Sequence, residues 1–290
     1  MALTQAQSLS SEILSIVNTI ALGKRCYIFD MITHEPGNVS LSMVNPDLCD
    51  DSNLSYKQKK VIIALPTGCY IAYSGLLFYG FENMIATCGS NFEFRNGITV
   101  KNIFWTQNTP EANTYSWKPH GIAVSKFKSH VLFCLWNQKF RQQSIGKVMK
   151  IRTEKNGVPN NRTCIEIQSD KNTPLYVCPT YIAENGNGDI CVSDVRAVVV
   201  TDAGGLLRFR YEGNSSKSNF DPYGICCDSS CNIIVADMKN DKIHMVDKDG
   251  EFLHHVTYEG IKMPRALSID SNDHVYVGEW DSDSIKIISR

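Results

Sequence analysis

The sequence predicts an all-β fold, a six-bladed β-propeller of four-stranded blades, on three observations. Three segments of sixteen residues align without a gap: residues 179–194, 222–237 and 264–279. Each segment begins at a proline and ends at a carboxylate, with an apolar run, a polar turn and a second apolar run between them. The prolines follow one another at intervals of 43 and 42 residues, which is the period of a four-stranded propeller blade.

The sequence that follows each carboxylate is also repeated. Asp237 is followed by the apolar run of residues 242–246 and then by the turn Asp-Lys-Asp-Gly. Asp194 is followed by the apolar run of residues 197–201 and by the turn Asp-Ala-Gly-Gly. The glycine in each turn supplies a residue that can take a positive φ, which closes a tight hairpin. Each repeat is therefore expected to form four strands joined by hairpins.

These repeats resemble the NHL repeat. The pattern of the NHL repeat is P-x-G-I-A-V-D, then N-I-Y-V-A-D, then R-I-Q-V-F-D, then G-x-F. It is matched in the same order by four runs of this chain: PYGICCD from Pro222, NIIVAD from Asn232, KIHMVD from Lys242 and GEF from Gly250. The segment PHGIAVSKFKSHVLFCLW, which begins at Pro119, fits the same frame with one extra residue, and residues 66–81 fit it loosely. The chain resembles the C-terminal domain of tripartite-motif (TRIM-NHL) ubiquitin ligases, without their RING, B-box and coiled-coil parts.

The repeats divide the chain, taken as one domain of residues 1–290, into expected parts. These are a closing strand in 13–20, divergent blades 1 and 2 in 21–116, and blades 3, 4, 5 and 6 in 117–173, 174–216, 217–259 and 260–290. The last blade stops after its third strand, so we expect residues 13–20 to pair into it and close the ring. An amphipathic helix over residues 10–20 is the alternative.

Composition and charge indicate a globular protein and argue against a strongly basic, nucleic-acid-binding one. The chain is 43% hydrophobic and 20% charged, so it can bury a core. Its net charge of −1 excludes a basic field over the whole molecule of the kind that attracts nucleic acid. Eleven cysteines without a secretory signal in the first 23 residues predict reduced thiols in the cytoplasm. The charge-free run from Val61 to Phe81 is long enough for a membrane span. Glycines and tyrosines divide it into short β-like runs, so we interpret it as propeller strands. We therefore expect no contact with a membrane.

No constellation of side chains predicts catalysis. Cys226 and Cys227 are neighbours in a strand and point to opposite faces, so they cannot share a metal ion and are expected to be small buried thiols. His120 follows a blade-entry proline and is the histidine expected at the rim of the central channel. The carboxylates at the repeat ends, Asp194, Asp237 and Glu279, recur from blade to blade, which favours a role in capping the loop or turn that follows each of them through hydrogen bonds to backbone N–H groups. We therefore expect no enzyme, no catalytic residue, no metal site and no cofactor.

One face of the propeller is expected to bind a partner, because the loops between second and third strands and those between blades lie on it. The expected partner-binding residues are Trp136, Lys139, Arg141, Arg196, Tyr223, Lys239, Arg265 and Trp280. Acidic residues in the same loops make this face mixed in charge, which suits a protein or peptide. Cations beside aromatic rings also suit single-stranded RNA, through phosphate contacts and base stacking.

The expected function is partner binding by a monomeric, non-catalytic propeller whose ligand is a protein or peptide. The resemblance to TRIM-NHL proteins implies a role in substrate recognition, with a link to ubiquitination. Binding of single-stranded or structured RNA through the basic and aromatic loop face is the first alternative. A propeller lyase or lactonase with a metal ion in its channel is the second.

Overall fold

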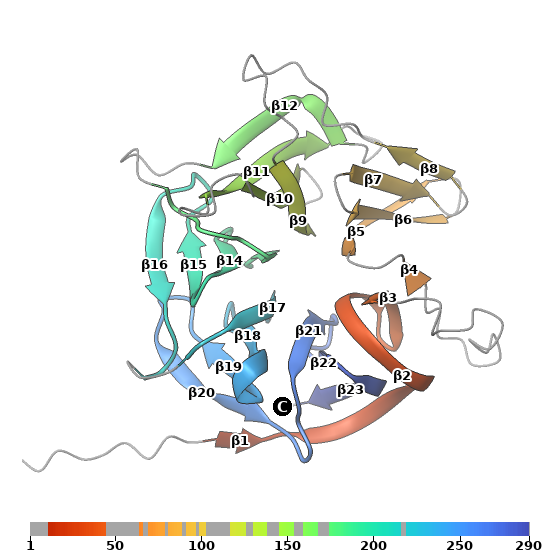
Figure 1. Cartoon of the computed structure of the whole chain (residues 1–290), viewed down its shortest axis with the longest axis vertical. Coiled ribbons are helices and arrows are strands. Elements are labelled where there is room, and N and C mark those ends of the chain that lie inside the picture. The colour runs from red at the N-terminus through yellow and green to blue at the C-terminus, as the bar shows by residue number, and fades with distance from the viewer. Residues whose placement is uncertain are drawn as a thin grey trace, which may run out of the picture.

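The chain is a β-propeller, in which separate sheets surround a central axis (Figure 1). Its structure is a computed structural model that describes residues 11–44, 64–65, 69–78, 81–88, 91–96, 99–102, 117–125, 130–137, 145–153, 159–167, 174–215 and 219–289. The described residues form β-strands, turns and one short 3₁₀ turn, Met238–Asn240. The all-β class that the repeats predict is confirmed.

Four sheets each contain four strands that follow one another along the chain and pair antiparallel. The first two are β5–β8 (Cys69–Phe78, Phe81–Cys88, Asn91–Asn96 and Thr99–Asn102) and β9–β12 (Trp117–Val124, His130–Asn137, Ile145–Thr153 and Pro159–Ile167). The next two are β13–β16 (Tyr181–Glu184, Ile190–Asp194, Ala197–Thr201 and Leu207–Tyr211) and β17–β20 (Pro222–Cys227, Ile233–Asp237, Lys242–Val246 and Phe252–Thr257). Each sheet is a blade of the predicted four-stranded kind.

Strand β1 (Ser11–Ile13) adds a fifth strand to the sheet of β17–β20, and the other strands form one larger sheet, in the order β21-β22-β23-β2-β3-β4. Their bounds are β2 Ser15–Glu35, β3 Asn38–Val44, β4 Ala64–Leu65, β21 Pro264–Ile269, β22 Val275–Glu279 and β23 Ser282–Ser289. The first part of β2 pairs with β23 and its second part pairs with β3. The prediction of six separate blades is therefore wrong for the described strands, which form four, because the continuous β2 joins the last blade to the strands near the N-terminus.

The N-terminal segment pairs with two blades. Strand β1 (Ser11–Ile13) lies parallel to β20, and Ser15 to Ala21 of β2 then pair antiparallel with β23. The predicted pairing of residues 13–20 with the last blade is present, and the alternative helix over residues 10–20 is wrong for the described part of it. Nothing in the repeat pattern predicts the pairing of β1 with β20. Closure of the whole ring stays a prediction.

The hydrophobic core lies between neighbouring blades. Strands β14, β15, β18 and β22 are buried along their whole length. One core cluster contains Phe133 of β10, Val198 of β15 and Val235 of β18, so it extends across three blades. Burial on both faces of a blade explains why these strands are continuous apolar runs in the sequence.

The charge-free run from Val61 to Phe81 forms strands β4 and β5 in its described part, as we expected. Within the described ranges, no helix is both long enough and apolar enough to cross a membrane.

Candidate binding site

The carboxylates at the repeat ends fix the loops that lead into the first strand of their own blades. Asp194 accepts hydrogen bonds from the backbone N–H groups of Val177 and Cys178, at 2.7 and 2.6 Å. Glu279 accepts one from the N–H of Lys262 at 2.8 Å. Burial raises the pKa of Asp194, and the backbone hydrogen bonds oppose this rise. The predicted capping through backbone N–H groups is confirmed, but the loops capped by these hydrogen bonds precede the carboxylates instead of following them, because each blade folds its second strand back beside its own entry loop.

The innermost strands of neighbouring blades approach too closely for a side chain at one position of the repeat. The N–H of Gly121 donates to the carbonyl of Thr180 at 2.7 Å, and a Cβ on Gly121 would lie 2.4 Å from that oxygen. A Cβ on Gly224 would lie 2.4 Å from the carbonyl oxygen of Arg265. Both glycines follow a blade-entry proline by two residues, so this contact explains the glycine of the repeat and positions Arg265 beside β17.

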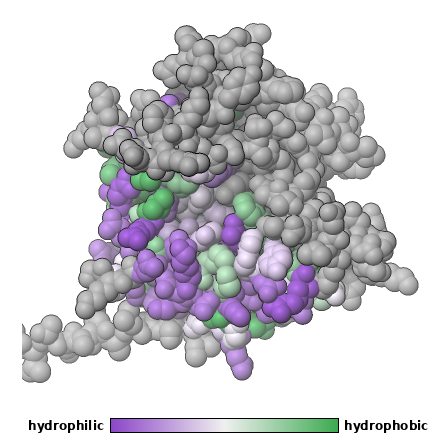
Figure 2. Space-filling model, in the orientation of Figure 1, coloured by the Kyte–Doolittle hydropathy of each residue, from purple (hydrophilic) through white to green (hydrophobic). Residues whose placement is uncertain are grey.

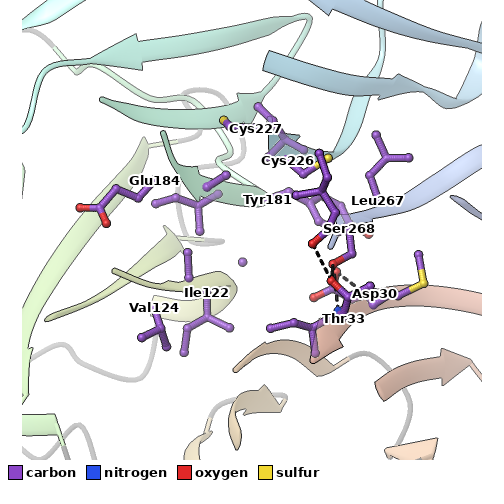
Figure 3. A pocket seen from close by; sticks show the side chains of 18 residues that line it. Asp30, Thr33, Ile122, Val124, Tyr181, Glu184, Cys226, Cys227, Leu267 and Ser268 are labelled. Atoms are coloured by element: carbon purple, nitrogen blue, oxygen red, sulfur yellow. Dashed lines mark hydrogen bonds between the residues drawn. The ribbon is translucent and has the colours of Figure 1, made fainter. Parts of the chain in front are cut away.

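The innermost strands enclose a central cavity of about 350 Å³ (Figure 3). Its described lining comes from β2, β9, β13, β17 and β21. Apolar lining residues include Ile122, Ile182, Ile225 and Leu267, and the acidic ones are Asp30 and Glu184. On one wall the Thr33 hydroxyl donates to the Ile269 carbonyl at 2.7 Å and lies 2.9 Å from the Ser268 hydroxyl. The cavity therefore combines an apolar wall with buried acidic groups.

Arg265 lies at the end of the cavity where the innermost strands begin. Arg265 and Tyr223 are the second residues of β21 and β17, and later residues of both strands line the cavity. The guanidinium carbon lies 4.4 Å from the ring centroid of Trp280, 4.6 Å from that of Phe29 and 4.8 Å from that of Tyr223. Each such cation–π contact stabilises by about 0.5–2 kcal/mol. These four residues are called the Arg265 cluster below.

One hydrogen-bond donor of the Arg265 guanidinium, its Nε, is buried and has no partner among the described residues. Its Nη1 reaches the Met238 sulfur at 4.0 Å, and the guanidinium also hydrogen-bonds to the Tyr181 hydroxyl. None of the ion pairs within the described ranges includes Arg265. Because an aromatic ring offers no lone pair in the manner of an oxygen, the three rings hold the guanidinium without satisfying its N–H groups.

Two more rings extend the Arg265 cluster. The ring of Tyr27 lies 5.4 Å from that of Trp280, and the ring of Tyr181 lies 6.2 Å from that of Tyr223. The Tyr181 hydroxyl donates to the Phe29 carbonyl at 2.6 Å. Burial raises the pKa of Tyr181, so its hydroxyl stays protonated at neutral pH and keeps this hydrogen bond.

Two cations that flank the Arg265 cluster are neutralised by acids. Lys239, next to Met238, lies 3.1 Å from Asp221, and Arg25 lies 2.8 Å from Asp281, next to Trp280. Figure 2 shows that the described part of the face in view is mainly hydrophilic, with small scattered apolar areas. The cluster therefore presents one unpaired guanidinium between two neutralised cations.

The structure brings three of the predicted partner-binding residues together: Tyr223, Arg265 and Trp280. The remaining predicted residues are not part of this cluster. Lys239 is adjacent but ion-paired, as described above. Arg196 is exposed in the turn between β14 and β15, where it takes a φ of 57°.

Trp136, in the blade β9–β12, is not among the rings that contact Arg265. The ring of Trp136, on β10, lies 5.7 Å from that of His120, on β9. His120 is absent from the described lining of the cavity, and its place at the channel rim stays a prediction. Lys139 and Arg141 lie outside the described residues.

The repeat alignment misses Phe29, Tyr27 and Tyr181. The first two belong to β2, in a segment where no repeat is recognisable. Tyr181 carries a signal, because it occupies the place in its repeat where Gly121 and Gly224 are glycines. Ala266 holds the same place in the last repeat, so among the four aligned repeats Tyr181 is a large aromatic side chain at a position that is otherwise glycine or alanine.

Cys226 and Cys227 are buried in different core clusters, on opposite sides of their blade, so the prediction of small buried thiols is confirmed. Among the side chains that the structure describes, no group of three or more histidines, cysteines and carboxylates could hold a metal ion.

Comparison with known proteins gives one partial relative. No family model matches the chain. The chain is 34% identical over 85 residues to Protein lin-41 of Caenorhabditis elegans. The aligned stretch is 29% of this chain and 7% of lin-41, so the chain corresponds to a small part of that protein.

Solved structures share the fold at low sequence identity. A streptogramin B lyase superposes with a TM-score of 0.51 at 9% identity, over 94% of this chain and 97% of that one. A chain of a nidogen/laminin complex gives 0.51 at 11% identity, over 83% and 84%. A luciferin-regenerating enzyme gives 0.54 at 8% identity, over 71% and 74%. The repeats, the partial match to lin-41 and these structures together show that the chain carries an NHL-like β-propeller.

Proposed function

We propose that this chain is a non-catalytic binding module, which holds an extended segment of a protein partner across the Arg265 cluster. The observation that carries the proposal is a half-buried guanidinium fixed by three aromatic rings at the end of the cavity, with no ion-pair partner among the described residues. Tryptophan, tyrosine and arginine are the residue types that contribute most binding energy at protein interfaces. The cavity of about 350 Å³ falls at the lower end of the size range of ligand pockets, so it suits one inserted side chain.

The NHL-like repeats support a cellular role of the TRIM-NHL kind. In that role the propeller recognises a substrate in the cytoplasm, acts as a monomer and supplies no chemistry of its own to ubiquitination.

Selection from a random peptide library on the purified chain tests the proposal. We expect enriched peptides that bind the native chain and lose affinity for Tyr223→Ala, because that variant removes one ring of the Arg265 cluster. Lys248→Gln is the control, since Lys248 is exposed in the turn between β19 and β20, at the opposite end of the strands from Arg265. Enrichment that is equal on all three chains, or absent, would overturn the proposal.

RNA is the second candidate ligand, because aromatic rings beside a guanidinium can stack on bases. The ion pairs of Lys239 and Arg25 favour a protein, since each phosphate contact needs a cation that is free to release counterions. Fluorescence anisotropy with randomised single-stranded RNA over several salt concentrations separates the two. Binding that weakens with salt at a slope of about −0.7 per phosphate would favour RNA.

A further inference from the structure

We infer that the Arg265 cluster selects a carboxylate of its peptide ligand, and that the neighbouring residue of the peptide places a neutral side chain in the central cavity. This inference rests on the proposed function and names the chemical group that the site recognises.

The first argument is the state of the Arg265 guanidinium. Its Nε is buried without a hydrogen-bond partner in the described part of the chain, and its Nη1 contacts a sulfur atom of Met238, which is a weak acceptor. Arg265 is half-buried, so a ligand reaches the outer N–H groups of the guanidinium rather than Nε, and an acceptor there gains a charge-assisted hydrogen bond. A carboxylate matches the planar guanidinium, because its two oxygens can accept two parallel N–H bonds at once.

The second argument is pre-organisation. The rings of Phe29, Tyr223 and Trp280 hold the guanidinium from three different strands or loops, and the Tyr181 hydroxyl fixes the backbone at Phe29. A lone arginine loses side-chain entropy when it binds a ligand. Here the rings have already restricted the Arg265 side chain, so little further ordering accompanies binding.

The third argument is the local charge, which favours a ligand group with one negative charge. Asp221 and Asp281 already pair with Lys239 and Arg25, so those two cations are not open to a second anionic group. A phosphomonoester carries more negative charge than the single cation of Arg265 balances, and a nucleic-acid backbone brings further phosphates for which the cluster has no free cation. At Arg265 itself, one carboxylate matches the single positive charge of the guanidinium.

The fourth argument sets the orientation of the peptide. Asp30 and Glu184 line the cavity (Figure 3), and Glu184 lies 3.0 Å from the imidazole of His130. A ligand carboxylate is repelled from that interior and attracted to Arg265 at its end. Ile182, Ile225 and Leu267 line the same cavity and suit an apolar side chain (Figure 3). The carboxylate therefore stays at the opening while a neutral neighbour enters.

The test begins with peptides enriched on the native chain. Each acidic residue of a peptide is replaced by its amide, and the terminal carboxylate is amidated in a separate peptide, so that a side-chain carboxylate and a chain terminus are distinguished. Dissociation constants are measured for the native chain, Arg265→Gln, Arg265→Lys and the control Lys248→Gln. We expect one of the peptide changes to weaken binding to the native chain roughly 10- to 100-fold, the range typical of a charged hydrogen-bonded pair.

The comparison between variants decides the inference. The same peptide change should have little effect on Arg265→Gln, because the partner of the carboxylate is gone, and an intermediate effect on Arg265→Lys, which keeps the charge without the planar fork. If the peptide change weakens binding equally for the native chain and for Arg265→Gln, the inference that Arg265 selects a carboxylate is overturned. Enriched peptides that share no carboxylate would also overturn it. In both cases the proposal that the chain binds a protein partner still holds. Absence of any peptide binding would overturn the proposed function itself. If Arg265→Gln does not fold, the peptide changes on the native chain and on Arg265→Lys still decide.

Discussion

Gly224→Ala is expected to destabilise the propeller and weaken its binding site together. A Cβ at this position would lie 2.4 Å from the carbonyl oxygen of Arg265 and 2.6 Å from the backbone nitrogen of Leu267, whereas ordinary contacts begin at 3.4 Å. Strands β17 and β21 must therefore separate by about 1 Å, because both contacting atoms belong to the backbone. The displaced oxygen belongs to Arg265, so the strain acts directly on the Arg265 cluster.

The expected change in the free energy of unfolding of Gly224→Ala follows from two opposing effects. Overpacking typically costs about 1–3 kcal/mol. The loss of chain entropy in the unfolded state offsets this by about 0.4–1 kcal/mol, since Gly224 does not need a positive φ. We expect a net loss of about 1–2 kcal/mol in the free energy of unfolding.

Urea denaturation at neutral pH measures this loss as a lower midpoint with an unchanged m value. Gly204→Ala is the matched control, because its Cβ meets the flexible carboxylate of Asp202 at 3.3 Å and should change stability by less than about 0.5 kcal/mol. If Gly224→Ala is as stable as the native chain, the close approach of the two strands is not the reason for the glycine.

Three other substitutions have defined outcomes. Gly121→Ala should cost as much as Gly224→Ala in urea denaturation, because its Cβ meets the Thr180 carbonyl at the same 2.4 Å, and unchanged stability would contradict this. Asp194→Ala should lower the free energy of unfolding by about 2 kcal/mol, since it removes a charged acceptor of two backbone N–H groups; thermal melting without a loss would refute the capping role. Burial, with His244 nearby, lowers the pKa of His255 to about 4, so between about pH 6.5 and 4 the unfolded state binds more protons and stability falls as pH falls. His255→Gln should flatten that dependence in urea titrations at several pH values, and an unchanged slope would contradict it.

The C-terminal blades could be predicted because the residues that make the same contacts recur at the same positions of each repeat. Asp194 caps a loop that lies 16 and 17 residues earlier in the chain, and Gly224 meets the backbone of the next blade. Such contacts recur with each blade, so they leave a pattern that one sequence is enough to show. The same repeats predicted Tyr223 and Arg265 as site residues, since they place the segments that link blades on one face.

The number of separate blades could not be predicted, because β2 does not end where a repeat pattern would end it. At Gly23, which has a φ of 81°, the pairing with β23 changes register and the strand continues to pair with β3. Phe29 was missed for the same reason. It lies in a strand without repeat residues and reaches Arg265 only because the propeller brings the two ends of the chain together.

The measurement that tests the central claim most directly is the affinity of one enriched peptide for the native chain and for Trp280→Ala. The Trp280 ring makes the shortest of the three ring contacts with Arg265, at 4.4 Å. The account predicts a loss of about 30-fold or more, the effect of removing a central aromatic contact from a protein interface, and no change for Lys248→Gln. Equal affinity for the native chain and Trp280→Ala would show that the peptide binds elsewhere on the propeller.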